Sequence, residues 1–121
     1  MNRDSVSPSS QEERGGARFL FLYPPGDMIR IEREDDGRRG RFVIYEDELY
    51  AGEMTYGWQS PTTIAVDHTG VESSFGGKGY GRRLIEAGVA FARREGLKIV
   101  PVCSFVRKAF ERDASLADVK A

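Results

Sequence analysis

Apolar and polar residues alternate along four consecutive segments of the chain, a pattern typical of half-buried β-strands. The expected strands cover residues 28–34, 41–45, 49–58 and 62–71. Three short polar connections separate them, namely Asp35-Asp36-Gly37, Glu46-Asp47-Glu48 and Gln59-Ser60-Pro61. Because such short connections join neighbouring strands, the pattern predicts an antiparallel meander. One face of the third strand is expected to carry Tyr50, Met54 and Tyr56, and one face of the fourth Ile64, Val66 and His68.

The spacing of apolar residues changes to the helical period of about 3.6 residues after Gly79. A single stripe, expected to face the sheet, then contains Tyr80, Leu84, Ala87, Gly88 and Phe91. Gly96 suits the left-handed residue that ends a helix. A fifth strand is expected over residues 97–102, and a short second helix begins with Ser104 as its N-cap. Pro101 lacks the N–H group of a strand ladder, so it predicts an edge or a break in that strand.

The distribution of polar and apolar residues divides the chain into an N-terminal tail and one domain. Residues 1–17 are polar and are expected to form a disordered N-terminal tail, and residues 18–121 a single domain. The apolar segment 18–23 precedes Pro24-Pro25-Gly26 and is expected to be an additional edge strand or a docking patch. Because two copies of the chain could also contact each other through this segment, the sequence is compatible with both a monomer and a homodimer.

Composition and charge exclude several classes of protein. The chain has 121 residues, of which 40% are hydrophobic and 31% charged, and its net charge is −1. These values fit an ordinary soluble domain and lack the basic field of a nucleic-acid binder. No apolar run is long enough to span a membrane, and no hydrophobic leader follows Met1. The single cysteine, Cys103, excludes an internal disulfide and a multi-cysteine metal site, so we expect a cytoplasmic protein without a metal.

A glycine-rich sequence, Phe75-Gly-Gly-Lys-Gly-Tyr-Gly81, lies where the fourth strand gives way to the helix. Free backbone N–H groups and the helix dipole make such a junction a cradle for anions, and we expect it to bind a pyrophosphate. Lys78, Arg82 and Arg83 add positive charge beside it. Arg82 stands where a dinucleotide fingerprint needs its third glycine, and no Gly-Lys-Ser/Thr sequence follows, so neither common nucleotide motif fits. The alternative interpretation is a plain glycine turn.

The loop resembles the acyl-CoA loop of the GNAT acetyltransferase superfamily, Gln/Arg-x-x-Gly-x-Gly/Ala. Gly79 and Gly81 match its two small positions, and Gly76 falls on the Gln/Arg position. Three further sequences extend the resemblance to about residues 29–119 and to the short, single-domain YjdJ-type subfamily: His68-Thr-Gly-Val71, Ala92-Arg93 with Gly96-Leu-Lys-Ile, and Pro101-Val-Cys103.

This resemblance implies an α/β (α+β) fold, with a mixed, mostly antiparallel sheet of five to six strands, flanking helices and a splayed strand pair at Pro101. It implies an N-acetyltransferase that takes acetyl-CoA or another acyl-CoA as co-substrate and an unknown amine or protein as acceptor. The donor is expected on Val71, Gly76, Gly77, Lys78, Gly79, Tyr80, Gly81 and Arg82. Many members protonate the leaving thiolate with a tyrosine of the last helix, and no tyrosine follows Tyr80 in this chain.

Two side chains are candidates for catalysis. Cys103 precedes a predicted helix N-terminus, which lowers the pKa of a thiol and favours an acyl-cysteine intermediate. His68 is the only histidine and could act as general base toward the substrate ammonium or toward Cys103. Each also has a structural interpretation, Cys103 as a small packed thiol and His68 as a hydrogen-bonded strand residue. Two other functions therefore stay open, a non-catalytic acyl-CoA or CoA-binding protein and a small interaction domain.

Overall fold

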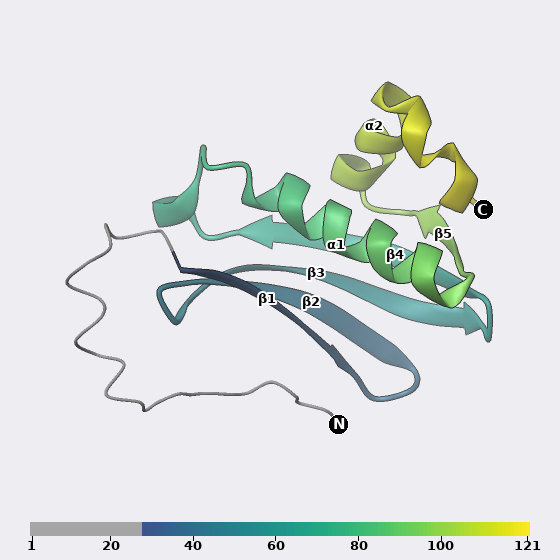
Figure 1. The fold of residues 1–121 in the computed structure, drawn as a ribbon, viewed down its shortest axis with the longest axis horizontal. Helices are drawn as coiled ribbons and strands as arrows, with labels where there is room; N and C mark the ends of the chain where they lie inside the picture. Colours follow the sequence, from purple (N-terminus) through teal and green to yellow (C-terminus); the bar gives the residue numbers. More distant parts are fainter. Residues whose placement is uncertain (1–27) are drawn as a thin grey trace.

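The computed structural model describes residues 28–121, which form one five-stranded sheet in the order β1-β2-β3-β4-β5 (Figure 1). An antiparallel meander contains β1 (Ile29–Asp35), β2 (Arg39–Glu46), β3 (Leu49–Ser60) and β4 (Thr63–Val71). The fifth strand, β5 (Lys98–Pro101), pairs with β4 in parallel. The predicted mixed, mostly antiparallel sheet is therefore confirmed. Our expectations for residues 1–17 and 18–23 lie outside the described residues.

Helices occupy the second half of the chain. A short 3-10 turn, η2 (Ser73–Phe75), follows β4 and leads into α1 (Tyr80–Glu95). The last strand is followed by α2 (Ser104–Arg112) and by η3 (Ala114–Val119). Cys103, rather than the predicted Ser104, is the N-cap of α2, because its backbone is extended and the helix begins one residue later. Within residues 28–121, no helix combines the length and the hydropathy that a membrane span requires.

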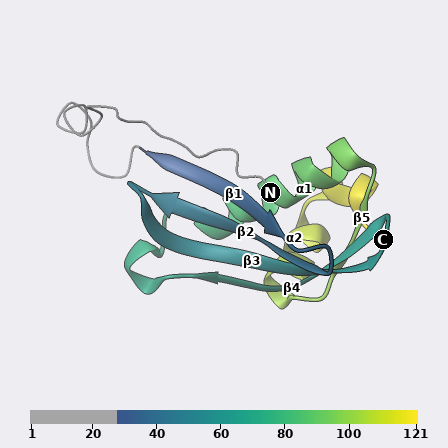
Figure 2. The same cartoon turned by 90° about the horizontal axis from the view of Figure 1, so that it is seen from below.

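The core lies between α1 and one face of the sheet (Figures 1 and 2). The predicted stripe of α1 faces that core, and Leu84 belongs to the same buried cluster as the strand residues Met54 and Tyr56. Gly88 allows the close approach, because a Cβ atom at this position would lie 2.7 Å from Cε of Met54. The opposite face carries ion pairs that cross the strands, including Arg41–Glu34, Arg41–Glu53 and Arg39–Asp67.

Two of the three register shifts in the sheet decide which faces Tyr50 and His68 occupy. The register shifts by one residue at Ala51 of β3 and again at Asp67 of β4. Because side chains alternate along a strand, each extra residue moves everything beyond it to the other face. Tyr50 therefore pairs with Tyr45 and does not share the face of Met54 and Tyr56, as we had predicted. The prediction that His68 shares the face of Ile64 and Val66 is wrong for the same reason, since His68 pairs with Thr55.

The pair β4–β5 opens at Val66. Their ladder ends where Val66 pairs with Pro101, and the Val66 carbonyl then accepts the amides of Val102 at 3.0 Å and Cys103 at 2.9 Å. Beyond this point β4 continues to Val71 with β3 as its only strand partner within residues 28–121, while the chain turns into α2. The break predicted at Pro101 is confirmed, and among the described strands it leaves one edge of β4 without a neighbour.

Candidate functional site

The glycine loop (residues 75–81) joins η2 to α1 and has a backbone that depends on its glycines. Gly77 and Gly79 each have φ near 79°, in the left-handed region that other residues avoid. Gly79 is the N-cap of α1, and no side chain caps the helix. Among residues 28–121, no acceptor receives the N–H groups of Gly77 through Arg82. These amides and the positive end of the helix dipole form an anion cradle.

A second helix N-terminus lies beside this cradle. Phe105, at the start of α2, packs on Gly81, since a Cβ atom there would lie 2.8 Å from two atoms of the phenyl ring. The small residue at 81 therefore lets α1 and α2 bring their N-termini together. The start of α2 also lies against β4, because the Cys103 amide donates to the Val66 carbonyl.

The three predicted cations of the loop have different surroundings. Lys78 places Nζ 2.7 Å from Oε1 of Glu46. Arg82 is 3.3 Å from carboxylate oxygens of both Glu86 and Asp113. Arg83 is exposed and forms no ion pair with any residue that the structure describes. Of these three cations, Arg83 is the one whose guanidinium is not committed to another described residue.

Glu46 is a member of this site that sequence reasoning missed. It is only 7% exposed, and Oε1 accepts a hydrogen bond from the Tyr80 hydroxyl as well as from Lys78. Lys78 first and Tyr80 second hold the pKa of this carboxyl below its ordinary value. Burial and the bond to Glu46 raise the pKa of Tyr80 to about 12. An acidic residue next to a turn is usually solvated, so the sequence carried no signal for this contact.

Cys103 lies against the open edge of β4. Its sulfur is 3.7 Å from Oγ1 of Thr69. Burial would raise the pKa of the thiol, but the Val106 amide, the Thr69 hydroxyl and the amides of Phe105 and Thr69 outweigh it. The pKa of Cys103 therefore lies below its ordinary value, and the thiolate is favoured.

His68 is not brought together with Cys103. Thr69 pairs with Met54 and so faces α1, whereas His68 pairs with Thr55 on the other side of the sheet. The imidazole leans along β4 over Gly70, where a Cβ atom would lie 3.1 Å from Nε2. The two candidate catalytic side chains thus occupy opposite faces of one strand.

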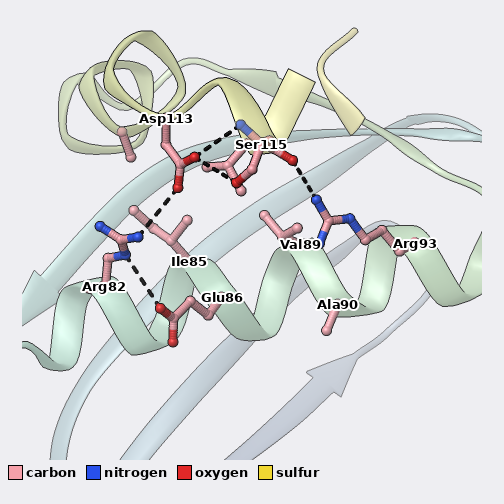
Figure 3. A pocket seen from close by; sticks show the side chains of 10 residues that line it. Arg82, Ile85, Glu86, Val89, Ala90, Arg93, Asp113 and Ser115 are labelled. Atoms are coloured by element: carbon pink, nitrogen blue, oxygen red, sulfur yellow. Dashed lines mark hydrogen bonds and ion pairs between the residues drawn. The ribbon is translucent and has the colours of Figure 1, made fainter. Parts of the chain in front are cut away.

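A pocket of about 240 Å³ lies between α1 and the C-terminal segment, one helical turn from the glycine loop (Figure 3). Its apolar lining includes Ile85, Val89 and Leu116, and Arg93 and Asp113 lie at its rim. Figure 3 shows Arg82 reaching from α1 toward Asp113 across one end of this pocket. Arg82, the residue after the glycine loop, is thus also part of the lining of this pocket.

Comparison with known proteins identifies similar sequences and folds. The sequence model described as GCN5-related N-acetyl-transferase matches residues 41–119. A GCN5-like protein from Staphylococcus aureus, solved in solution by NMR, is 33% identical with a TM-score of 0.60 over 76% of this chain and 87% of its own. No match was found among curated proteins.

Two more distant structures share the fold. A GNAT family acetyltransferase from Elizabethkingia anophelis, with acetyl-CoA bound, is 13% identical with a TM-score of 0.55, covering 71% of this chain and 74% of its own. A Bacillus subtilis acetyltransferase in complex with CoA is 18% identical with a TM-score of 0.51, covering 60% of this chain and 63% of its own.

Proposed function

Because this chain belongs to the GCN5-related N-acetyltransferase family, we propose that it transfers an acyl group from acyl-CoA, in the first instance acetyl-CoA, to an amine. The observation that carries the proposal is the cradle of unpaired amides at the N-terminus of α1, next to the open edge of β4. An anion site and an unpaired strand edge together suit a donor that has a pyrophosphate and a chain of amides.

The donor would bind mainly through the protein backbone. Its pyrophosphate would lie on the amides between Gly77 and Arg82, with Gly76 and Val71 bordering the path along β4. Lys78 would contribute its amide, since its ammonium group is held by Glu46. The distant Elizabethkingia anophelis and Bacillus subtilis structures, which contain acetyl-CoA and CoA, support a donor of this class.

The lowered pKa of Cys103 supports a covalent route. The thiolate attacks the carbonyl carbon of the acetyl thioester, a new carbon–sulfur bond forms, and the CoA sulfur leaves and takes up a proton. A neutral amine then attacks acetyl-Cys103, forming the amide and releasing the Cys103 thiolate, while the proton of the attacking nitrogen passes to a base. In the direct route the amine attacks the donor itself. Water is the candidate base in the covalent route, and water or His68, which faces the far side of β4, is the candidate base in the direct route.

The finer assignments are part of the same proposal. We place the chain in the YjdJ-type subfamily, with its acetyltransferase domain over residues 18–121 and a tail over residues 1–17. We expect it to act in the cytoplasm on an amine or a protein acceptor, as a monomer or homodimer.

Intact-mass spectrometry after incubation with excess acetyl-CoA tests the covalent route. We expect a gain of one acetyl group that is absent in Cys103→Ala and is removed by added amines. If no adduct forms but acetyl-CoA raises the melting temperature, the direct route holds, because a ligand that binds only the native state stabilises it. If neither effect occurs, the acyl-CoA proposal is wrong.

A non-catalytic acyl-CoA-binding protein is the second candidate. The absence of tyrosine after Tyr80 favours it, because α2 then offers no phenol to protonate the leaving thiolate. Release of free CoA in the presence of a panel of amines and N-terminal peptides separates the two functions, since a binding protein would release none.

A further inference from the structure

We propose that Glu46 is a positioning residue that holds the glycine loop in its anion-binding conformation. The inference rests on the acyl-CoA donor site proposed above. Glu46 is the last residue of β2 and therefore belongs to the rigid sheet, whereas its two partners belong to the loop and to the first turn of α1.

The contacts of Glu46 fix the loop on both sides of Gly79. One carboxylate oxygen, Oε1, accepts from Nζ of Lys78 at 2.7 Å and from the hydroxyl of Tyr80. Hydrogen bonds to a buried, charged acceptor are among the stronger ones in proteins. A single acid on the sheet thus determines where the left-handed residue between Lys78 and Tyr80 must lie.

The loop needs such a contact because of its composition. Four of the residues between 76 and 81 are glycines, which have the widest choice of backbone conformations. The Phe75 and Tyr80 rings, which stack at 6.3 Å, close the loop on itself, and Lys78 lies 5.5 Å from the Phe75 ring centre. Only Glu46 joins this closed unit to β2 through side-chain hydrogen bonds among the described residues. Ordering the loop before binding lowers the entropic cost of holding a pyrophosphate.

The charges agree with a positioning role. A lone carboxylate below the cradle would repel an anion, but the Lys78 ammonium neutralises it. Lys78 is thereby used to balance Glu46, and the phosphate charge is left to the backbone amides, the helix dipole and Arg83. Loss of Glu46 should therefore weaken the binding only of those acyl donors that contain the pyrophosphate.

The test compares the dissociation constants of acetyl-CoA and S-acetylpantetheine, which lacks the pyrophosphate, by NMR titration. We expect Glu46→Gln and Tyr80→Phe each to raise the dissociation constant of acetyl-CoA about tenfold, which corresponds to about 1.4 kcal/mol of binding free energy. Binding of S-acetylpantetheine should stay within about twofold of wild type. The matched controls, Glu53→Gln and Tyr45→Phe, lie on the other face of the sheet and should change neither constant.

The outcomes are distinct. Equal weakening of the binding of acetyl-CoA and S-acetylpantetheine would indicate general damage to the fold and would overturn the positioning role. Unchanged or tighter binding of acetyl-CoA by Glu46→Gln would overturn it as well. The double variant should be no weaker than the poorer single variant, because both substitutions break one connection, and additive losses would contradict the inference. Tyr80→Phe decides the matter alone if Glu46→Gln does not fold. If wild type binds no acetyl-CoA, the donor proposal itself fails, and the role of Glu46 with it.

Discussion

Cys103 shows how strongly local surroundings alter one side chain. Cys103 is the N-cap residue of α2, and its sulfur lies beside the Thr69 hydroxyl. The amides of Val106 and Phe105 add to the effect of Thr69 and outweigh burial, so the pKa of the thiol is lowered. At any pH between the lowered and the ordinary pKa, Cys103 is mostly thiolate where a free cysteine would be mostly thiol.

Thr69→Ala should therefore slow the alkylation of Cys103 near neutral pH. Removing the hydroxyl removes one hydrogen-bond partner of the sulfur that lowers the pKa, so the pKa rises toward its ordinary value and the thiolate fraction at pH 7 falls. The pH profile of iodoacetamide alkylation measures this shift, and the profile of Thr69→Ala should move to higher pH. Thr55→Ala, which affects a hydroxyl on the opposite face, should leave the profile unchanged.

His68→Gln should separate the direct route from the acetylation of Cys103. If His68 receives a proton from the acceptor amine in the direct route, the substitution lowers kcat by about a hundredfold, the size usual for loss of a general base. Acetylation of Cys103 should keep its rate, because His68 lies on the other face of β4. Rapid-quench mass spectrometry follows the two reactions separately. Equal slowing of both would contradict this arrangement.

Among the elements, the glycine loop depends most on backbone conformation. Gly79→Ala should destabilise the fold by about 1 kcal/mol, because the left-handed conformation is unfavourable for a residue with a Cβ atom. The same substitution should weaken the binding of acetyl-CoA, because it disturbs the N-cap of α1.

Gly37→Ala is the matched control for this loop. Gly37 also has a positive φ, near 93°, with open space around it, but it lies in the hairpin between β1 and β2. It should lower the free energy of unfolding by a similar amount, measured by urea titration, while donor affinity stays at the wild-type value. A loss of affinity in both variants would show that general stability, and not the loop, controls binding.

Sequence periodicity predicted every strand and both α-helices of the described residues, because alternation and the helical stripe report directly on which side is buried. It could not predict the bulges at Ala51 and Asp67, since an extra residue in a ladder has no compositional mark. For that reason, the predictions of which sheet face Tyr50 and His68 occupy were wrong. Glu46 was missed because its partners lie far along the chain, where only the folded structure brings them together.

For the molecule as a whole, the close approach of β3 and β4 at Gly52 and Gly70 fixes the position of β4, the strand that borders the proposed donor site. Gly52→Ala would place a Cβ atom 2.6 Å from the Gly70 carbonyl oxygen, which is backbone and cannot move without displacing β4. We expect a loss of about 1–3 kcal/mol in unfolding free energy, as is usual for overpacking.

Gly57→Ala serves as its control on the same strand. The nearest atom to its Cβ atom would be in the flexible Arg39 guanidinium, at 3.0 Å, and the nearest backbone atom would lie 4.0 Å away. This variant should unfold at nearly the wild-type urea concentration. If the two variants lose equal stability, the contact between Gly52 and β4 does not have the importance we assign to it.

The opening of the sheet at Val66 also affects how the molecule comes apart. The meander is built from consecutive hairpins, whereas β5 joins it only across the whole of α1, through the one parallel pair of the described sheet. Contacts between distant parts of a chain form late in folding and open easily. The amides of Val102 and Cys103, both bound to the Val66 carbonyl, should therefore exchange with solvent deuterium sooner than those of β2 and β3. A donor that bridges β4 and α2 would slow their exchange selectively, so that binding and the final step of folding become one event.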